Sequence, residues 1–217
     1  MYNCCLVQIQ LRFMHIGIAG NIGSGKTTLT RLLSKHFEWE PHYEAMDNNP
    51  YITDFYDDMT RWSFNLQIYF LHTRFHSLLQ AKDSPNTIVQ DRTIYEDAYI
   101  FAPNLHAMGL MSTRDFDTYQ ALFTNIKTSV DAPDLMIYLR SSIGNLVSQI
   151  QKRGREYEDS IRLDYLKRLN ERYEAWISTY KEGNLLIIDV DDIDFENNPE
   201  HLGSIISKID AEINGLF

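Results

Sequence analysis

Residues Gly20–Thr27 read Gly-Asn-Ile-Gly-Ser-Gly-Lys-Thr, which fits the pattern G-x-x-x-x-G-K-[ST]. The apolar run Ile16–Ala19 before them predicts a short buried strand, and apolar residues recur after them at helical spacing. A strand, a glycine-rich loop and a helix in this order bind phosphate, because backbone N–H groups turn inward and the helix N-terminus adds partial positive charge. We therefore predict a phosphate-binding loop rather than a chance glycine-rich turn: Gly20, Asn21, Ile22, Gly23, Ser24, Gly25, Lys26, Thr27 and Thr28.

The composition limits the class of protein. The chain has 217 residues, 44% of them hydrophobic, which suits one globular domain with a substantial core. Its formal net charge of -10 argues against a nucleic-acid partner, because duplex binding relies on clustered cations. No apolar run is long enough to span a bilayer, so we expect no membrane partner. Cys4 and Cys5 are adjacent and cannot form a disulfide framework, which favours a reducing compartment and hence a cytoplasmic location.

The segment 1–13 reads as separate from the domain. It lacks the positively charged start and the small-residue cleavage site of a signal peptide. Met14 comes directly before the strand that enters the phosphate-binding loop. We expect either that Met14 is the natural first residue or that residues 1–13 are a dispensable extension. Residues 14–217 then form one domain, without repeats or linkers.

Short apolar segments that predict strands alternate with helical patterns along the chain. The predicted strands are residues 16–19, 38–43, 87–90, 135–139 and 185–189. Helical spacing marks residues 29–37, 60–81, 116–126, 146–150, 166–180 and 202–213. Another helix begins near Thr93, which has capping-box spacing to Glu96. This alternation indicates an α/β fold, with a five-stranded parallel sheet that carries helices on both faces.

Polar residues follow several of these strands. Glu44 comes after the second strand, Asp91 and Arg92 come at the end of the third, and Asp189 ends the fifth. Ligands of such folds bind beyond the carboxyl ends of the strands. We therefore expect these residues and the phosphate-binding loop to converge on one crevice.

A phosphate-binding loop occurs in switch GTPases, in motors and in kinases. The D-x-x-G and N-K-x-D elements of a GTPase are absent from the sequence, and a motor would be longer. A small-molecule kinase remains, and it needs cations over the donor phosphates, because negative charge spreads over the oxygens of the transferring phosphoryl group. Lys152, Arg153 and Arg155 suit such a lid, although a solvated basic helix face is the alternative interpretation.

Three separated motifs resemble one family of small-molecule kinases. They are RWSFNLQ at Arg61–Gln67, DRTIYEDAYIFA at Asp91–Ala102 and RGREYE at Arg153–Glu158. In order and spacing they are similar to the deoxyribonucleoside kinases, in the branch that contains deoxycytidine, deoxyguanosine and deoxyadenosine kinases. The resemblance covers nearly all of residues 14–217. It implies a P-loop kinase fold with an arginine-bearing lid.

The resemblance also implies roles for the residues at the strand ends. Glu44 resembles the carboxylate that takes the proton of the deoxyribose 5'-OH, and Arg92 resembles the arginine that holds the 5'-oxygen and the transferred phosphoryl group. Lys26 reaches the outer phosphates and completes the predicted catalytic set. Thr27 and Asp91 are the predicted ligands of Mg²⁺. Without the resemblance, Glu44 reads as an exposed acid and Asp91 as a helix N-cap.

The predicted substrate pocket combines polar and aromatic residues. Gln67 resembles the amide that forms hydrogen bonds to the edge of the base. Arg74 and Asp97 resemble the charged pair that lies beside the base. Tyr56 and Glu158 resemble the pair that forms hydrogen bonds to the 3'-OH of the sugar. Trp62, Phe101 and Tyr69 resemble aromatic walls, although core packing is the simpler interpretation of such side chains. Gln149 stands where many members have another lid arginine. The predicted substrate-binding set is Glu44, Tyr56, Trp62, Gln67, Arg74, Arg92, Asp97, Phe101 and Glu158, and ATP also contacts Arg153 and Arg155.

The sequence therefore predicts a kinase that transfers the γ-phosphoryl group of ATP, with Mg²⁺, to the 5'-OH of a deoxynucleoside. We favour a purine, deoxyadenosine or deoxyguanosine, and a deoxycytidine-preferring kinase is the first alternative. A nucleoside monophosphate kinase of the thymidylate type and a non-catalytic nucleotide-binding subunit are the others. The resemblance further implies a homodimer and feedback inhibition by a deoxynucleoside triphosphate.

Overall fold

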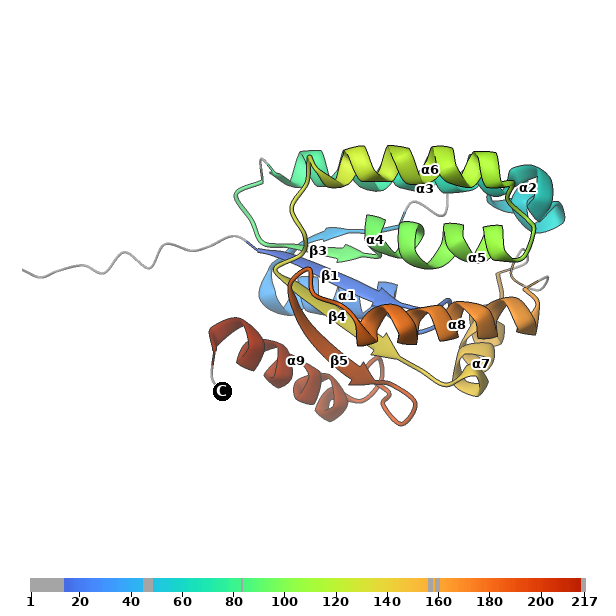
Figure 1. The fold of residues 1–217 in the computed structure, drawn as a ribbon. Helices are drawn as coiled ribbons and strands as arrows, with labels where there is room; N and C mark the ends of the chain where they lie inside the picture. The colour runs from blue at the N-terminus through green and yellow to red at the C-terminus, as the bar shows by residue number, and fades with distance from the viewer. Residues whose placement is uncertain (1–13, 45–48, 83, 156–157, 159–160, 216–217) are drawn as a thin grey trace, which may run out of the picture.

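The computed structural model describes residues 14–44, 49–82, 84–155, 158 and 161–215. These residues form one sheet with five parallel strands in the order β2-β3-β1-β4-β5 (Figure 1). The strands are β1 (His15–Gly20), β2 (Glu40–His42), β3 (Ile88–Asp91), β4 (Leu135–Arg140) and β5 (Asn184–Asp189). The predicted five-stranded parallel sheet is confirmed. Its central strand, β1, leads into the phosphate-binding loop.

Helices cover both faces of the sheet, as predicted. One face carries α1 (Lys26–Phe37) and α9 (Pro199–Asn214), and the other carries α3 (Met59–Lys82), α6 (Thr113–Lys127) and α8 (Leu163–Ser178) (Figure 1). Successive residues of β4 alternate between these two cores. Ile137 packs in the core beneath α1 and α9, while Met136 and Tyr138 pack in the core beneath α3 and α8. The apolar run of this strand is continuous because both of its faces are buried.

Shorter helices complete the part of the chain that the structure describes. They are α2 (Ile52–Asp57), α4 (Ile94–Glu96), the π-helix η1 (Asp97–Phe101), α5 (Ala102–Ala107) and α7 (Ile143–Arg153). Figure 1 shows α2 and α7 at the end of the sheet toward which the strand arrows point. Among the described helices, none combines the length and the apolar character that crossing a membrane requires.

Two helical segments differ from the predicted elements. Helix α2 lies in a region for which the sequence predicted only a turn-rich segment. The helix that begins after Thr93 has the predicted capping box with Glu96, but it widens into η1 before it continues as α5. Pro103 lies in the first turn of α5 and has no N–H to donate, so one backbone hydrogen bond is missing at this point. Residues 1–13, predicted to be an extension, lie outside the described residues, and that prediction remains untested.

Strand β2 is shorter than predicted because the chain turns at Glu38. Glu38 ends α1 in the left-handed conformation, with φ 59°, and pairing with β3 starts only at Glu40. A residue in this conformation cannot lie in a strand. The predicted strand over residues 38–43 therefore begins two residues too early and also ends one residue late.

The parallel pairing brings the polar strand ends together, as predicted. Strand β3 pairs with β1 so that Asp91 lies beside Ile18, and the backbone N–H of Arg92 donates to the carbonyl oxygen of Ile18 at 3.0 Å. Asp91 and Arg92 therefore lie next to the start of the phosphate-binding loop. The chain reaches Glu44 after β2, which is the neighbour of β3 on the other side.

The turn at Glu38 can be tested directly. The Glu38 side chain is exposed, and a left-handed conformation strains any residue that has a Cβ but not glycine. We predict that the free energy of unfolding is about 1 kcal/mol higher for Glu38→Gly than for the matched variant Glu38→Ala. Urea unfolding followed by circular dichroism measures this difference. A Glu38→Ala variant that is as stable as Glu38→Gly would contradict the left-handed turn.

Candidate active site

The phosphate-binding loop needs glycine at two positions. Gly23 and Gly25 have φ of 86° and 91°, in the left-handed region. A Cβ on Gly23 would lie 2.8 Å from the carbonyl oxygen of Leu146, and a Cβ on Gly25 would lie 2.8 Å from Cζ of Phe195. Glycine is therefore required at both positions, because it allows the left-handed backbone conformation and lets the loop pack closely against α7 and the segment after β5.

Lys26 is the first residue of α1, and its ammonium group is buried in the loop. Its Nζ donates to the carbonyl oxygen of Asn21 at 3.0 Å. Burial and, to a smaller extent, the charge of Arg92 lower the pKa of Lys26 to about 8, although the charges of Asp91 and Glu44 oppose the shift. A bound anion would favour the charged form, because an opposite charge nearby raises the pKa of a lysine.

Thr27 and Asp91 meet at the predicted metal position. Oγ1 of Thr27 donates to Oδ2 of Asp91 at 2.5 Å. Oδ1 of Asp91 is buried and has no hydrogen-bond partner among the described residues, and burial raises the pKa of this carboxyl group. Hydroxyl and carboxylate oxygens fit Mg²⁺, which takes one or two protein ligands and completes its shell with phosphate oxygens and water. In the described ranges, no three His, Cys, Asp or Glu side chains group to hold a metal on their own.

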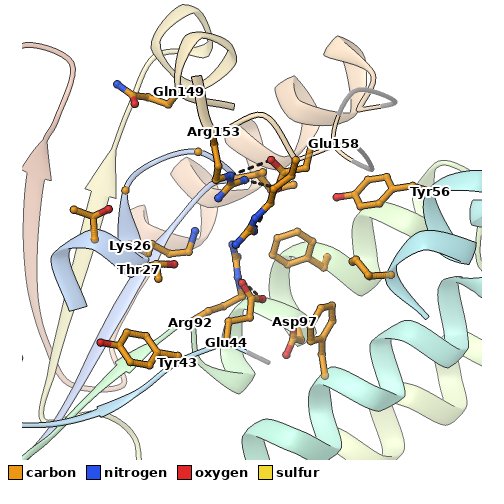
Figure 2. Close-up of a pocket in the computed structure, with 18 of the residues that line it drawn as sticks. Lys26, Thr27, Tyr43, Glu44, Tyr56, Arg92, Asp97, Gln149, Arg153 and Glu158 are labelled. Carbon is orange, nitrogen blue, oxygen red and sulfur yellow. Dashed lines mark hydrogen bonds and ion pairs between the residues drawn. The ribbon is translucent and has the colours of Figure 1, made fainter. Parts of the chain in front are cut away.

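Glu44 lies between two buried arginines. Its Oε1 forms ion pairs with Nη2 of Arg74 and, at 3.1 Å, with Nε of Arg92. Burial alone would raise the pKa of Glu44, but the charges of Arg92, Arg74 and Lys26 outweigh it and hold the pKa below its usual value. Glu44 is therefore a carboxylate at neutral pH, as a base requires. Figure 2 shows it beside Arg92, facing the same cavity as Lys26.

Arg74 also pairs with Asp97, as the sequence predicted. Nη1 of Arg74 donates to Oδ2 of Asp97, and both side chains are almost completely buried. Burial raises the pKa of Asp97 to about 7, although Arg74 and Arg92 hold it down. The pair joins α3 to η1, so a structural role and a place beside the substrate are both compatible with it.

A cavity of about 720 Å³ joins these groups into one site. A volume of this order suits a small organic molecule. Most of the predicted site residues line it: Ile22, Gly23, Gly25, Lys26, Thr27, Thr28, Glu44, Tyr56, Gln67, Arg92, Asp97, Phe101, Arg153, Arg155 and Glu158. Oε1 of Gln67 is buried without a hydrogen-bond partner among the described residues, so it is an acceptor available to a ligand. Arg92 lies over the ring of Phe101, 4.6 Å from its centroid.

The predicted lid arginines are tied to the wall of the same cavity. Arg153 ends α7, and its Nε donates to Oε2 of Glu158 at 3.0 Å (Figure 2). Nη1 of Arg155 lies 3.6 Å from Oε1 of Glu158. Gln149 and Lys152 also line the cavity. The intervening residues of the RGREYE motif, 156–157, lie outside the described residues.

A smaller hollow of about 370 Å³ adjoins the phosphate-binding loop. It is lined by Ser24, by Lys152 and by the segment Asp191–Glu196 after β5. Asp191 anchors that segment, because its Oδ1 accepts hydrogen bonds from the Ser141 hydroxyl and the Ser142 N–H. The hollow lies on the loop side of the site, away from Gln67 and Glu44.

The structure does not bring every predicted residue to the cavity. Trp62 is not among the described residues that line it. Trp62 instead packs beside Tyr51, at 5.9 Å between ring centroids, and lies under the guanidinium of Arg61. Tyr69, another proposed wall, also packs on Tyr51. Both aromatic rings belong to the packing around α2 and α3, which is the simpler interpretation of their spacing.

Several cavity residues were missed at the sequence level. Ile52 and Phe55 line the cavity from α2. These two apolar residues follow Pro50 and are three positions apart, a helical spacing that could have indicated α2. Arg31 of α1 and Tyr165 of α8 also line the cavity. Helical periodicity alone does not show whether such a residue faces a pocket, the solvent or the core. Glu96 was identified only as a helix cap, yet Nη1 of Arg92 lies 3.3 Å from its carboxylate.

Comparison with known proteins identifies the family. A family model described as deoxynucleoside kinase matches residues 16–214. The chain belongs to the deoxynucleoside kinase family. This kinase is similar to the deoxyadenosine/deoxycytidine kinase of Bacillus subtilis, with 39% identity over 92% of this chain and 93% of the relative. It is 37% identical to the deoxyguanosine kinase of Lactobacillus acidophilus, over 89% of this chain and 88% of the relative.

Solved structures agree with this assignment. The deoxyadenosine kinase of M. mycoides, with the products dCMP and a flexible dCDP bound, superposes with a TM-score of 0.82 and 31% identity, over 91% of this chain and 100% of that one. The structure of the same enzyme with bound dATP gives a TM-score of 0.80. The kinase therefore has the predicted P-loop kinase fold and is a phosphotransferase.

The lowered pKa of Lys26 predicts a proton uptake. At pH 8 about half of the Lys26 side chains are neutral in the free kinase, and bound phosphates favour the charged form. We predict that ATP binding at this pH takes up about half a proton and that affinity falls as the pH rises further. Calorimetric titration in two buffers of different ionisation enthalpy measures the uptake.

A matched variant separates Lys26 from the other cations at the cavity. Lys152→Met removes a positive charge that also lines the cavity, but it leaves the buried lysine in place. The proton uptake should persist in Lys152→Met. Binding enthalpies that are equal in the two buffers for the unmodified kinase would show that Lys26 is already charged.

Proposed function

We propose that this kinase transfers the γ-phosphoryl group of ATP to the 5'-OH of a deoxynucleoside and prefers a purine. The observation that carries the proposal is the position of Glu44, a largely buried carboxylate paired with Arg92 at 3.1 Å, in the cavity that also contains Lys26. A base, a cation for the transferring group and a donor loop thus share one space. Phosphoryl transfer needs this positioning and charge stabilisation more than it needs covalent chemistry.

Glu44 is the proposed general base. Its lowered pKa keeps it ionised, so it accepts a hydrogen bond from the 5'-OH and takes the proton as the new oxygen–phosphorus bond forms. Arg92 stabilises the negative charge on the transferring group, and Lys26 holds the outer phosphates. Thr27 and Asp91 are the proposed ligands of Mg²⁺, which neutralises phosphate charge when it is bound. Arg153 and Arg155 are proposed to act as the lid over the donor.

The proposed acceptor pocket lies between α2, α3 and η1. Gln67 offers an acceptor and a donor to a base edge, and Tyr56 with Glu158 would bond the 3'-OH. Asp97 lines the cavity, whereas its partner Arg74 is not among the described residues that line it. The names of the relatives from B. subtilis and L. acidophilus support a purine, and the first of them also names deoxycytidine. Deoxycytidine is therefore the first alternative substrate.

A nucleoside monophosphate kinase is a poorer fit to this pocket. An acceptor that already carries a phosphate needs a cation at the position of its phosphate. The group beside Arg92 is instead the carboxylate of Glu44, which would repel a phosphate. The residues that a non-catalytic subunit would be free to lose, Lys26, Glu44, Asp91 and Arg92, are all present.

The proposal includes three properties that follow from family membership. The kinase is proposed to act as a homodimer, in the cytoplasm, and to be inhibited by a deoxynucleoside triphosphate. The structures of M. mycoides deoxyadenosine kinase with bound dATP and dCTP support the last of these, because such triphosphates bind that relative.

Replacing Glu44 tests the proposed base. We predict that Glu44→Gln binds the nucleoside with nearly unchanged affinity but loses about 10²–10⁴-fold in kcat, because the amide cannot take a proton. Coupled-enzyme kinetics and calorimetric binding measure the two quantities. Glu40→Gln, which neutralises an acid of β2, the strand that precedes Glu44, and lies outside the cavity, should keep normal turnover. Normal turnover in Glu44→Gln would exclude it as the base.

A substrate panel tests the acceptor. Purified kinase with ATP and Mg²⁺ is offered the four deoxynucleosides, the matching ribonucleosides and deoxyadenosine monophosphate, and kcat/KM is compared. We expect the highest value for deoxyadenosine or deoxyguanosine and no phosphorylation of the monophosphate. Activity on the monophosphate alone would overturn the proposal, and the highest value for deoxycytidine would overturn the purine preference.

A further inference from the structure

A buried carboxylate behind the proposed catalytic arginine makes more contacts than its helix cap requires. The side chain of Glu96 is completely buried. Its Oε2 accepts from the N–H of Thr93 at 2.8 Å, which is the capping-box bond. Its Oε1 accepts from the Tyr173 hydroxyl at 2.8 Å and from the N–H of Gly20 at 3.3 Å, and lies 3.3 Å from Nη1 of Arg92.

The contacts of Arg92 explain why this carboxylate matters. Nη1 of Arg92 faces Glu96 and donates to the Tyr173 hydroxyl at 2.5 Å, and Nε faces Glu44. No hydrogen bond links Nη2 to any residue in the described part of the chain, so this nitrogen is available to a ligand. The backbone of Arg92 is left-handed, with φ 68°, a conformation that persists only where the surroundings hold it. Glu96 and Tyr173 hold the guanidinium from behind and leave its outer edge to the cavity.

The same cluster reaches the phosphate-binding loop. The N–H of Gly20, the first residue of that loop, donates to the oxygen of Glu96 that also faces Arg92. Helix α8, which carries Tyr173, makes a second connection to the loop, because Nδ2 of Asn21 donates to the carbonyl oxygen of Leu166 at 3.1 Å and to Oδ1 of Asn170 at 3.2 Å. The arginine of the acceptor side and the loop of the donor side are therefore held by one set of hydrogen bonds.

We propose that Glu96 and Tyr173 are positioning residues for phosphoryl transfer, which act by fixing the Arg92 guanidinium in register with the phosphate-binding loop. The inference rests on the proposed function, because it assigns Arg92 to the transferring phosphoryl group. Neither side chain lines the cavity, so neither touches the substrate directly. Loss of Glu96 leaves Arg92 with Glu44 as its remaining carboxylate partner, and this draws the cation toward the base.

Glu96→Gln separates positioning from helix capping. Glutamine also occupies the third position of a capping box, so the helix start is preserved while the charge that faces Arg92 is lost. Tyr173→Phe removes only the hydroxyl group. We expect each variant to reduce kcat about tenfold or more while KM for ATP and for the deoxynucleoside changes less than about threefold, because the misplaced group acts in the transition state.

Two comparisons make the test specific. Tyr138→Phe is the matched control, because it also removes a buried tyrosine hydroxyl that donates to a glutamate of α8, Glu174, at 2.8 Å, and Tyr138 has no bond to Arg92. It should keep normal kcat. In an Arg92→Lys background, Glu96→Gln and Tyr173→Phe should have little further effect, because they act through the arginine. Circular dichroism checks that each variant is folded.

The outcomes separate the inference from the proposed function. Absence of deoxynucleoside phosphorylation by the unmodified kinase would overturn the proposed function itself. An active kinase whose kcat is unchanged in Glu96→Gln and Tyr173→Phe would overturn the inference alone. Effects that add fully to that of Arg92→Lys would also overturn it. If Glu96→Gln does not fold, Tyr173→Phe decides between these outcomes.

Discussion

The site depends on one constraint, which is that charges removed from water must be paired. Arg74, Arg92, Glu96 and Asp97 are almost completely buried, the Glu44 side chain is only 15% exposed, and an isolated ion there would be strongly unfavourable. Each of them therefore has at least one opposite charge within hydrogen-bond distance. The pairing sets the orientation of the guanidinium groups and lowers the pKa of the proposed base. Catalytic geometry and stability of the closed site thus have the same physical origin.

The parallel sheet makes this pairing possible. Strands β2, β3 and β1 are neighbours that point the same way, so Glu44, Asp91 and the phosphate-binding loop meet at one edge although they are far apart in the sequence. The loop binds the donor with backbone groups, which need only glycine and a helix start. The proposed acceptor side uses side chains from α2, α3 and η1 that line the cavity, and we therefore expect substrate choice to depend on this part of the fold.

Local rules predicted much of this molecule. The five strands and the capping box at Thr93 follow from residue patterns of a few positions and are confirmed, and the predicted phosphate-binding loop lies between β1 and α1 as expected. Helix α2 was missed because it is short and follows a turn-rich segment. Trp62 was assigned to the cavity by its motif, but a motif does not say which side of a helix faces the ligand. Glu96 was recognised only as a cap, although its spacing of four residues from Arg92 allows the ion pair that the structure shows.

The sequence by itself determined the fold class, the position of the donor loop and the family, because periodicity and glycine spacing act over short distances along the chain. Only the tertiary structure decided which charges meet. The contacts among Glu44, Arg74, Arg92 and Tyr173 join residues that lie up to 81 positions apart, and their partners are chosen by strand order and helix packing. Apart from Arg92 and Glu96, which are four residues apart, the paired charges meet only through three-dimensional proximity, and local sequence patterns do not encode these pairs.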